Sequence, residues 1–126
     1  AVVYRSRMCS TSRRVWAAFS RDGGRSFGAP IRVDDGAPLG RVDVALLEDR
    51  SALVQWLEAG VNDADILARR VTADGTRSAT VTIAESSARR ASGYPRMVRD
   101  GRRVIFAWTE LGNPSRVRVA EAMAGE

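Results

Sequence analysis

The chain has 126 residues and a mass of 13.7 kDa; 44% of the residues are hydrophobic and 28% are charged, which excludes a disordered tail, a collagen-like fibre or a low-complexity linker. The net charge of +5 comes entirely from arginines spread along the chain, never in a cluster larger than a pair, so nucleic-acid binding is disfavoured. There is no His and a single Cys, Cys9, which excludes imidazole chemistry and an internal disulfide, and no apolar run reaches the roughly 20 residues of a membrane span.

The elements expected along the chain are short strands separated by turns. An opening strand covers residues 1–4, and the last expected strand covers residues 117–120. Between them, turn signals at 49–51, 60–64 and 74–75 delimit a middle unit. The four strands expected in that unit are Arg41–Glu48, Ala52–Glu58, Asp65–Thr72 and Ala79–Ala84. Helices are not expected, because no stretch keeps apolar residues at helical spacing over several turns.

Two of the expected strands are apolar on both faces. Residues 52–57 and 104–108 lack the alternation of polar and apolar side chains that marks a strand with one solvated face. We therefore expect both strands to be covered on both sides, as in a small sheet stacked between two similar sheets.

The sequence repeats at an interval of 52 residues. Segment 20–26 matches segment 72–78 in its Asp, Gly, Arg and Ser, and Ile31 matches Ile83. The aromatic residues at the same interval are Tyr4, Trp56 and Trp108. Four-stranded antiparallel units that recur every roughly 40 to 50 residues are typical of a β-propeller.

The expected fold is therefore all-β: a partial β-propeller of four-stranded antiparallel blades. The expected parts are a part-blade at 1–38, a complete blade at 39–88 and a second part-blade at 89–126, which together make ten strands, or about two and a half blades. Propellers usually close with at least four blades. We expect the chain to be a piece of a longer polypeptide, or one chain of an assembly that supplies the missing strands.

The first turn resembles a known motif. Ser20, Asp22, Gly24 and Phe27 fit the Asp-box pattern, Ser/Thr-x-Asp-x-Gly-x-x-Trp/Phe, of sialidases and other Asp-box propellers. The short Asp and Ser side chains can bond backbone groups within the turn, and Gly23 and Gly24 tolerate positive φ. The aromatic ring is expected to enter the apolar space between blades.

The second copy of the motif is degenerate. Thr72 and Asp74 match the pattern, but Thr76 replaces the glycine and Ala79 replaces the aromatic residue. We expect a weaker core contact here, with Asp74-Gly75 making the turn alone. Both copies are expected to be structural, on the face away from any active site.

The resemblance covers essentially the whole chain and implies an interior or C-terminal part of a six-bladed sialidase-like propeller, commonly secreted or periplasmic. Such enzymes use an arginine triad for the substrate carboxylate, a Tyr–Glu pair as nucleophile and an Asp as acid/base. The family's Arg-Ile-Pro signature is missing.

The residues of the right types on the expected functional face are Arg41, Asp43, Glu58, Tyr94, Arg96 and Glu110. No cofactor or metal is implied, and 62–65 is expected to be a solvated turn, since it lacks the Gly and distal Glu of an EF-hand.

Each candidate has a structural interpretation as well. The two glutamates can be strand-end acceptors, Tyr94 can pack at a sheet edge, and Arg41 and Arg96 can pair with Asp43 or nearby acids. Two functions therefore stay open. The parent is a sialidase-like hydrolase or acidic-glycan-binding protein, or a non-catalytic propeller scaffold for protein partners. The partners expected are the remaining blades, from the parent chain or another subunit, and an acidic glycan. The isolated chain is expected to lack hydrolase activity.

Overall fold

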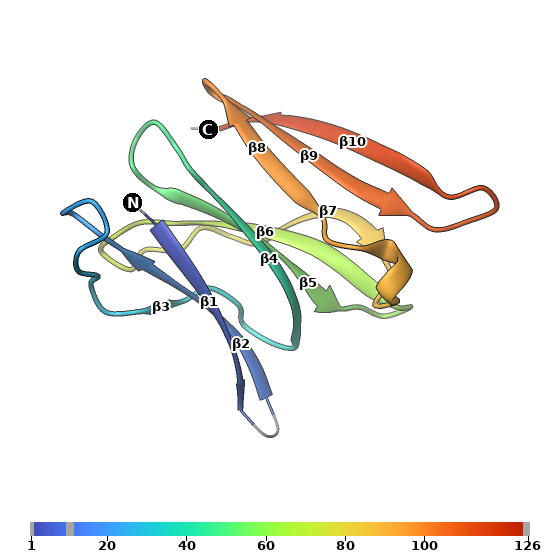
Figure 1. Ribbon diagram of the computed structural model, residues 1–126, viewed down its shortest axis with the longest axis horizontal. Coiled ribbons are helices and arrows are strands. Elements are labelled where there is room, and N and C mark those ends of the chain that lie inside the picture. Colours follow the sequence, from blue (N-terminus) through green and yellow to red (C-terminus); the bar gives the residue numbers. More distant parts are fainter. Residues whose placement is uncertain (1, 10–11, 125–126) are drawn as a thin grey trace.

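The computed structural model describes residues 2–9 and 12–124, which form ten β-strands and one short 3-10 helix (Figure 1). The first strands are β1 (Val2–Cys9), β2 (Ser12–Phe19) and β3 (Ile31–Arg32), followed by β4 (Pro38–Leu46), β5 (Ala52–Ala59), β6 (Ala64–Val71) and β7 (Val81–Ser86). The helix η1 (Arg90–Ser92) precedes β8 (Arg96–Asp100), β9 (Arg103–Glu110) and β10 (Arg116–Met123). The expected all-β class is confirmed.

The strands form three antiparallel sheets. The orders are β1-β2-β3, β4-β5-β6-β7 and β10-β9-β8, so that within each sheet every strand pairs with its sequence neighbours. The expected four-stranded middle unit is present. Its last strand begins at Val81, two residues later than expected, because Ser78 exchanges hydrogen bonds with Arg70 outside the regular ladder.

The central sheet lies between the two others, and the core is divided accordingly (Figure 1). Val54 and Trp56 of β5 pack with Val15 and Ala17 of β2, whereas Leu53 of the same strand packs toward Met97 and its neighbours in the β8–β10 sheet. Alternate residues of β5 thus serve two different interfaces. The expectation that 52–57 is covered on both faces is confirmed.

Within the described residues, the matching expectation for 104–108 is met on one face only. Val104 and Phe106 are buried against the central sheet, but Ile105 and Ala107 on the other face are only half-buried. Within the described residues no further sheet lies over that face. The β8–β10 sheet therefore presents an apolar outer face.

The 52-residue interval relates two of its three aromatic residues, Trp56 and Trp108, by equivalent packing between sheets. Trp56 pairs with Leu67, which packs toward β1–β3, and Trp108 packs toward the central sheet in the same sense. Tyr4 pairs with Ala17, which packs in the opposite sense, toward the central sheet. The strand position of Tyr4 is therefore not equivalent to those of the two tryptophans.

The turn after β2 is closed by the hydrogen bonds expected of its sequence. The Oδ1 atom of Asp22 accepts the backbone N–H groups of Arg25 and Ser26 at 3.0 and 2.9 Å, and the Ser20 hydroxyl accepts the N–H of Gly24 at 2.8 Å. Gly23 and Gly24 have φ values of 73° and 93°, as expected. These contacts make the segment a rigid turn.

Phe27 does not enter the core, contrary to expectation. Its side chain is 42% exposed and belongs to none of the buried clusters. The whole segment 21–30 is exposed, because the chain leaves the sheet at Ser20 and returns only at β3. The turn is therefore fixed by polar contacts rather than by an aromatic anchor.

The second turn uses more than Asp74 and Gly75. Asp74 accepts hydrogen bonds from the Thr72 hydroxyl and from the N–H of Thr76, while Thr72 and Thr76 also bond through their backbones. Gly75 has a φ of 94°. The expectation that the Asp–Gly pair makes this turn alone is wrong, since both threonines hold the aspartate.

A buried carboxylate ties two strands of the first sheet together. Asp34 has no exposed surface; its Oδ1 accepts the N–H of Val15 at 2.7 Å and its Oδ2 accepts Arg32 at 3.0 Å. A charge without solvent is stable only when such partners replace its water. Asp34 therefore fixes the short strand β3 against β2.

A buried arginine joins the first sheet to the central one. Arg69 of β6 donates to the carbonyl oxygen of Val33 and to Asp35, both at 2.7 Å. Asp35 also accepts Arg77, from the β6–β7 turn, at 2.9 Å. The segment after β3 is therefore held by two arginines of the neighbouring sheet.

Replacement of Asp34 is expected to destabilise the protein. Asp34→Ala leaves the Val15 N–H buried and unpaired and Arg32 without its acceptor, so urea unfolding should show a loss of about 3 kcal/mol. Asp100→Ala, which removes an exposed ion pair with Arg103, is the control and should change stability by less than about 1 kcal/mol. Equal effects of the two substitutions would contradict this role of Asp34.

Acid is expected to weaken the turns. The Ser26 hydroxyl lowers the pKa of Asp22 from 3.8 to about 2, Thr72 does the same to Asp74, and Arg69 does so to Asp35. Because the unfolded carboxyls bind protons near pH 3.8, the stability that they supply above about pH 4 is lost as the pH falls toward about 2. Urea unfolding across this range should show a smaller loss for Asp22→Asn than for the original chain; identical losses would show that Asp22 does not contribute.

Candidate functional site

The candidate residues lie at the end of the sheets opposite the box-like turns. The turn after β2 and the hairpins β4–β5, β6–β7 and β8–β9 share one end, at the left in Figure 1. The other end of the sheets is where β7 connects to β8 and β9 connects to β10. Near the strand termini at this end lie Arg41, Glu58, Tyr94 and Glu110. The residues most suited to chemistry are thus separated from the structural turns.

Arg41 sits in a β-bulge of β4. The register of β4 against β5 shifts on both sides of Gly40, and Gly40 and Arg41 have φ values of 97° and 54°. The arginine leaves the regular ladder as a result. Its guanidinium then donates to the Ser92 hydroxyl at 2.7 Å and to the carbonyl oxygens of Gly93 and Ala88, both at 2.9 Å.

Further bonds from the Arg41 guanidinium to the carbonyl oxygens of Arg89 and Ser87 complete the set. Five acceptors in the segment 87–93 therefore surround this one side chain. A guanidinium with planar, fixed donors suits several carbonyl groups of one loop. Arg41 acts as a brace for the β7–β8 connection, with acceptors other than the acids expected from the sequence.

Asp43 links the central sheet to the last one. Its Oδ2 accepts the backbone N–H of Met97 at 2.9 Å and lies 3.5 Å from Nε of Arg96, and its Oδ1 accepts the N–H of Val44. The Arg96–Asp43 pair expected under the structural interpretation is present. Both oxygens of the carboxylate thus accept backbone N–H groups.

Tyr94 and Arg96 are the exposed members of the set. The Tyr94 side chain is 67% exposed and the Arg96 side chain 78% exposed. The Arg41 guanidinium carbon lies 6.0 Å from the centre of the Tyr94 ring, at the limit of a cation–π contact. The structure therefore brings Arg41, Asp43, Tyr94 and Arg96 into one neighbourhood.

The two glutamates are engaged elsewhere. Glu58 accepts the indole N–H of Trp56 at 3.1 Å, which satisfies the polar atom of a buried ring. Glu110 accepts a bidentate pair from Arg118 at 3.0 and 3.2 Å, and this guanidinium lowers the pKa of Glu110. Both are acceptors at strand ends, although the donors come from their own sheets. Neither makes a hydrogen bond with Tyr94 in the described structure.

The polar segment 61–65 forms a turn that supports the same loop. Asp63 accepts the N–H of Ala88 at 3.0 Å, and this bond lowers the pKa of the carboxyl. With Asp65 and Glu85 it borders a shallow hollow of about 120 Å³. Among residues 2–9 and 12–124, no three Asp, Glu, Cys or His side chains are placed to hold a metal ion.

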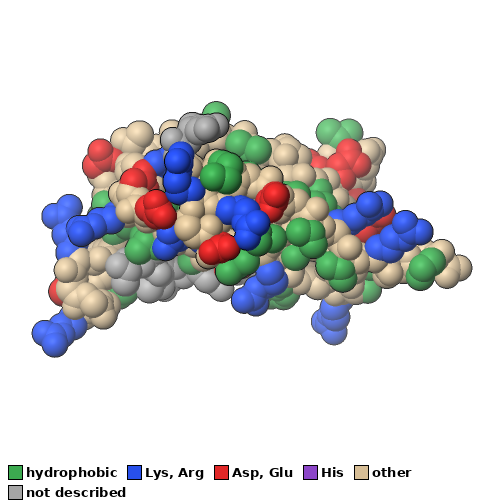
Figure 2. Space-filling model, turned by 90° about the horizontal axis from the view of Figure 1, so that it is seen from above, with side chains coloured by type: hydrophobic (Ala, Val, Ile, Leu, Met, Phe, Trp, Pro, Cys, Tyr) green, Lys and Arg blue, Asp and Glu red, His purple; other side chains and the backbone are tan. Residues whose placement is uncertain are grey.

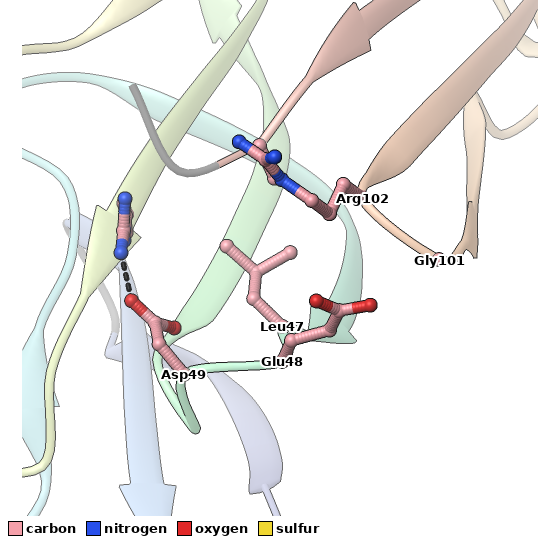
Figure 3. A pocket seen from close by; sticks show the side chains of 7 residues that line it. Leu47, Glu48, Asp49, Gly101 and Arg102 are labelled. Carbon is pink, nitrogen blue, oxygen red and sulfur yellow. Dashed lines mark hydrogen bonds and ion pairs between the residues drawn. The ribbon is translucent and has the colours of Figure 1, made fainter.

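A hollow of about 270 Å³ lies at the opposite end, between the β4–β5 and β8–β9 turns. Arg102 reaches over Leu47 from the β8–β9 turn, and Glu48 and Asp49 lie along the other side (Figure 3). Asp49 is paired with Arg70. The sequence did not point to this place, because its residues come from two turns about fifty positions apart.

Comparison of the chain with protein families, curated proteins and solved structures finds no match. The described residues contain no helix with the length and hydropathy of a membrane span. The site is therefore interpreted from its own geometry.

Sequence reasoning missed three residues that bind the structural arginines or a buried backbone N–H group: Asp34, Asp35 and Ser92. Asp34 and Asp35 precede a glycine and resemble a solvated turn in the sequence, and Ser92 lies in a polar loop. Their burial and bonding depend on Arg69 and Arg41, which are far away along the chain. Only the bulge at Gly40 offers a local signal, since a glycine inside a strand often marks one.

Arg41→Lys is expected to loosen the β7–β8 connection even though it keeps the charge. A lysine ammonium has three donors in place of the fork that reaches five acceptors, so amides of segment 87–93 should exchange with solvent at least about tenfold faster. Arg96→Lys is the matched control, because Arg96 is largely exposed. Unchanged amide exchange in segment 87–93 of the Arg41→Lys variant would contradict the role of Arg41 in holding this segment.

Proposed function

We propose that this chain is a segment of an Asp-box β-propeller of the sialidase-like class. Three features support the proposal: antiparallel sheets stacked face to face, the 52-residue interval that relates β6 to β10, and two turns that fit or partly fit the Asp-box pattern and hold its aspartate by hydrogen bonds. In such a fold the sheets would surround a central channel, and further sheets would complete the ring.

We further propose that the segment recognises acidic sugars and does not hydrolyse them by itself. The observation behind this is the exposed pair of Tyr94 and Arg96 beside Arg41, on the loop end that binds ligands in propellers. A guanidinium holds a carboxylate through charge-assisted bonds, and an aromatic ring packs against the apolar face of a sugar. The net charge of +5 favours an anionic ligand.

The acids argue against a complete catalytic centre in this segment. Retaining hydrolysis needs a nucleophile, an acid/base and their close approach. Asp43 and Glu110 are held by structural partners, and Glu58 accepts a buried indole. A reaction would need groups from other parts of a longer protein.

Arg96→Ala and Tyr94→Ala are each expected to weaken binding of a sialylated oligosaccharide at least about tenfold, since each removes one of the two exposed contacts. Titration calorimetry measures the affinity, and Arg103→Ala at the opposite end is the control. A fluorogenic sialoside should not be hydrolysed by the chain. Equal affinity in all three variants, or no binding by the original chain, would reject the glycan proposal.

A non-catalytic scaffold for protein partners is the second candidate. The outer face of the β8–β10 sheet favours it, because Val98, Val117 and Val119 are all more than half exposed there. Figure 2 views the molecule from the side on which this sheet lies, and hydrophobic side chains are visible there among charged ones. Exposed apolar patches of this kind mark interaction surfaces.

A further inference from the structure

The hollow between the β4–β5 and β8–β9 turns has charges of both signs around an apolar side chain. Its volume of about 270 Å³ lies just below the roughly 300–1,000 Å³ of sites for drug-sized ligands, so it suits a molecule of amino-acid size. Leu47, which is only 6% exposed, belongs to its lining, and Arg102 reaches over this side chain from the other turn (Figure 3). The remaining lining residues are Glu48, Asp49, Arg70, Gly101 and Ala124.

Hydrogen bonds within the two hairpins hold both walls of the hollow in place. In the β4–β5 hairpin, the N–H of Leu47 donates to the carbonyl oxygen of Ser51 at 2.8 Å, and the N–H of Arg50 donates to that of Leu47 at 3.0 Å. In the β8–β9 hairpin, Gly101 has a φ of 61°, and its carbonyl oxygen accepts Nη1 of Arg99 at 3.0 Å. Both walls are therefore internal hairpins that are ordered without a ligand, which lowers the entropic cost of binding.

The charges of the two walls are not paired with one another across the hollow. Figure 3 draws a single interaction among the lining side chains, from Arg70 to Asp49, so this acid is engaged. Glu48 is 58% exposed, and its ion pair with Arg99 is long, at 3.8 Å. Arg102 makes no ion pair with either of the two acids. Glu48 and Arg102 thus offer an anionic and a cationic group on different sides of Leu47.

We propose that this hollow binds a small zwitterion in which a short aliphatic chain separates a carboxylate from an ammonium group. Arg102 binds the carboxylate through charge-assisted hydrogen bonds, Glu48 binds the ammonium group, and the aliphatic chain packs on Leu47. The lining contains two acids and two arginines, so a ligand without net charge matches it. The proposal is independent of the glycan site, which lies at the other end of the sheets.

Three ligands of similar length test the role of each charge. 6-Aminohexanoate carries both charged groups, hexanoate lacks the ammonium group, and hexylamine lacks the carboxylate. Titrated into the full chain and followed by amide chemical shifts, 6-aminohexanoate should saturate with a Kd of about 1 mM and shift the amides of Glu48 and Gly101. The other two should each bind at least about threefold more weakly, because each loses one ionic contact.

Equal binding of the three ligands would show that only the aliphatic chain is recognised, and it would overturn the proposal. No saturation by 6-aminohexanoate in the millimolar range, or shifts confined to other segments of the chain, would overturn it as well.

Two variants of the protein test which residue binds which charge. Glu48→Gln and Arg102→Gln should each weaken binding of 6-aminohexanoate at least about threefold. Glu48→Gln should not weaken binding of hexanoate, and Arg102→Gln should not weaken binding of hexylamine. The matched controls are Asp100→Asn and Arg103→Gln, which change residues of the same β8–β9 hairpin that do not line the hollow and should leave the affinity unchanged.

All four substitutions are at exposed positions, so the variants are expected to fold. An equal loss of affinity in the control variants, or an exchange of the two roles between Glu48 and Arg102, would contradict the assignment.

Discussion

Burial of β5 on both faces is the constraint on which the structure depends. Val54 and Trp56 face one neighbouring sheet and Leu53 faces the other, so neither face of the strand can be left to solvent without a large loss of buried apolar surface. Neither outer sheet is covered on both faces within the described residues. The central sheet therefore contacts both other sheets, and β5 is buried on both faces only when both of them are in place.

Arginine provides the cross-connections that apolar packing does not. Arg69 reaches from the central sheet to the segment after β3, and Arg41 reaches to the connection that leads into the last sheet. Both use the planar fork to bind backbone carbonyl oxygens, a role that lysine fills poorly. The many arginines of this sequence are thus partly structural, and even the largely exposed Arg96 lies within ion-pair distance of Asp43.

The strands and their stacking could be predicted from the sequence because they depend on local signals. The two-sided apolar run of β5 and the Asp–Gly turns are visible in a few residues. The role of Phe27 could not be predicted, since its exposure depends on how the segment 21–30 leaves the sheet. The Tyr4 match does not extend to the strand register, because Tyr4 is paired with Ala17 of β2, which packs toward the central sheet.

The end of the sheets at which the candidate residues lie could be predicted from the sequence, but of their partners only the Arg96–Asp43 pair was expected. Glu58 and Glu110 follow tryptophan at the same interval, yet one accepts an indole and the other a guanidinium. Such differences arise from single neighbours, the buried Trp56 and the half-exposed Arg118. The sequence pattern thus predicts at which end of the sheets a glutamate lies, whereas its hydrogen-bond partner depends on contacts within the folded structure.

The division of the core into separate interfaces has a consequence for how the chain comes apart. One buried cluster joins the first sheet to the central sheet, and two others join the central sheet to the last. Within the described residues, each outer sheet thus packs against the central sheet alone, as repeats in a solenoid contact only their neighbours. Separation of one outer sheet from the central sheet would therefore leave the buried cluster on the opposite face intact.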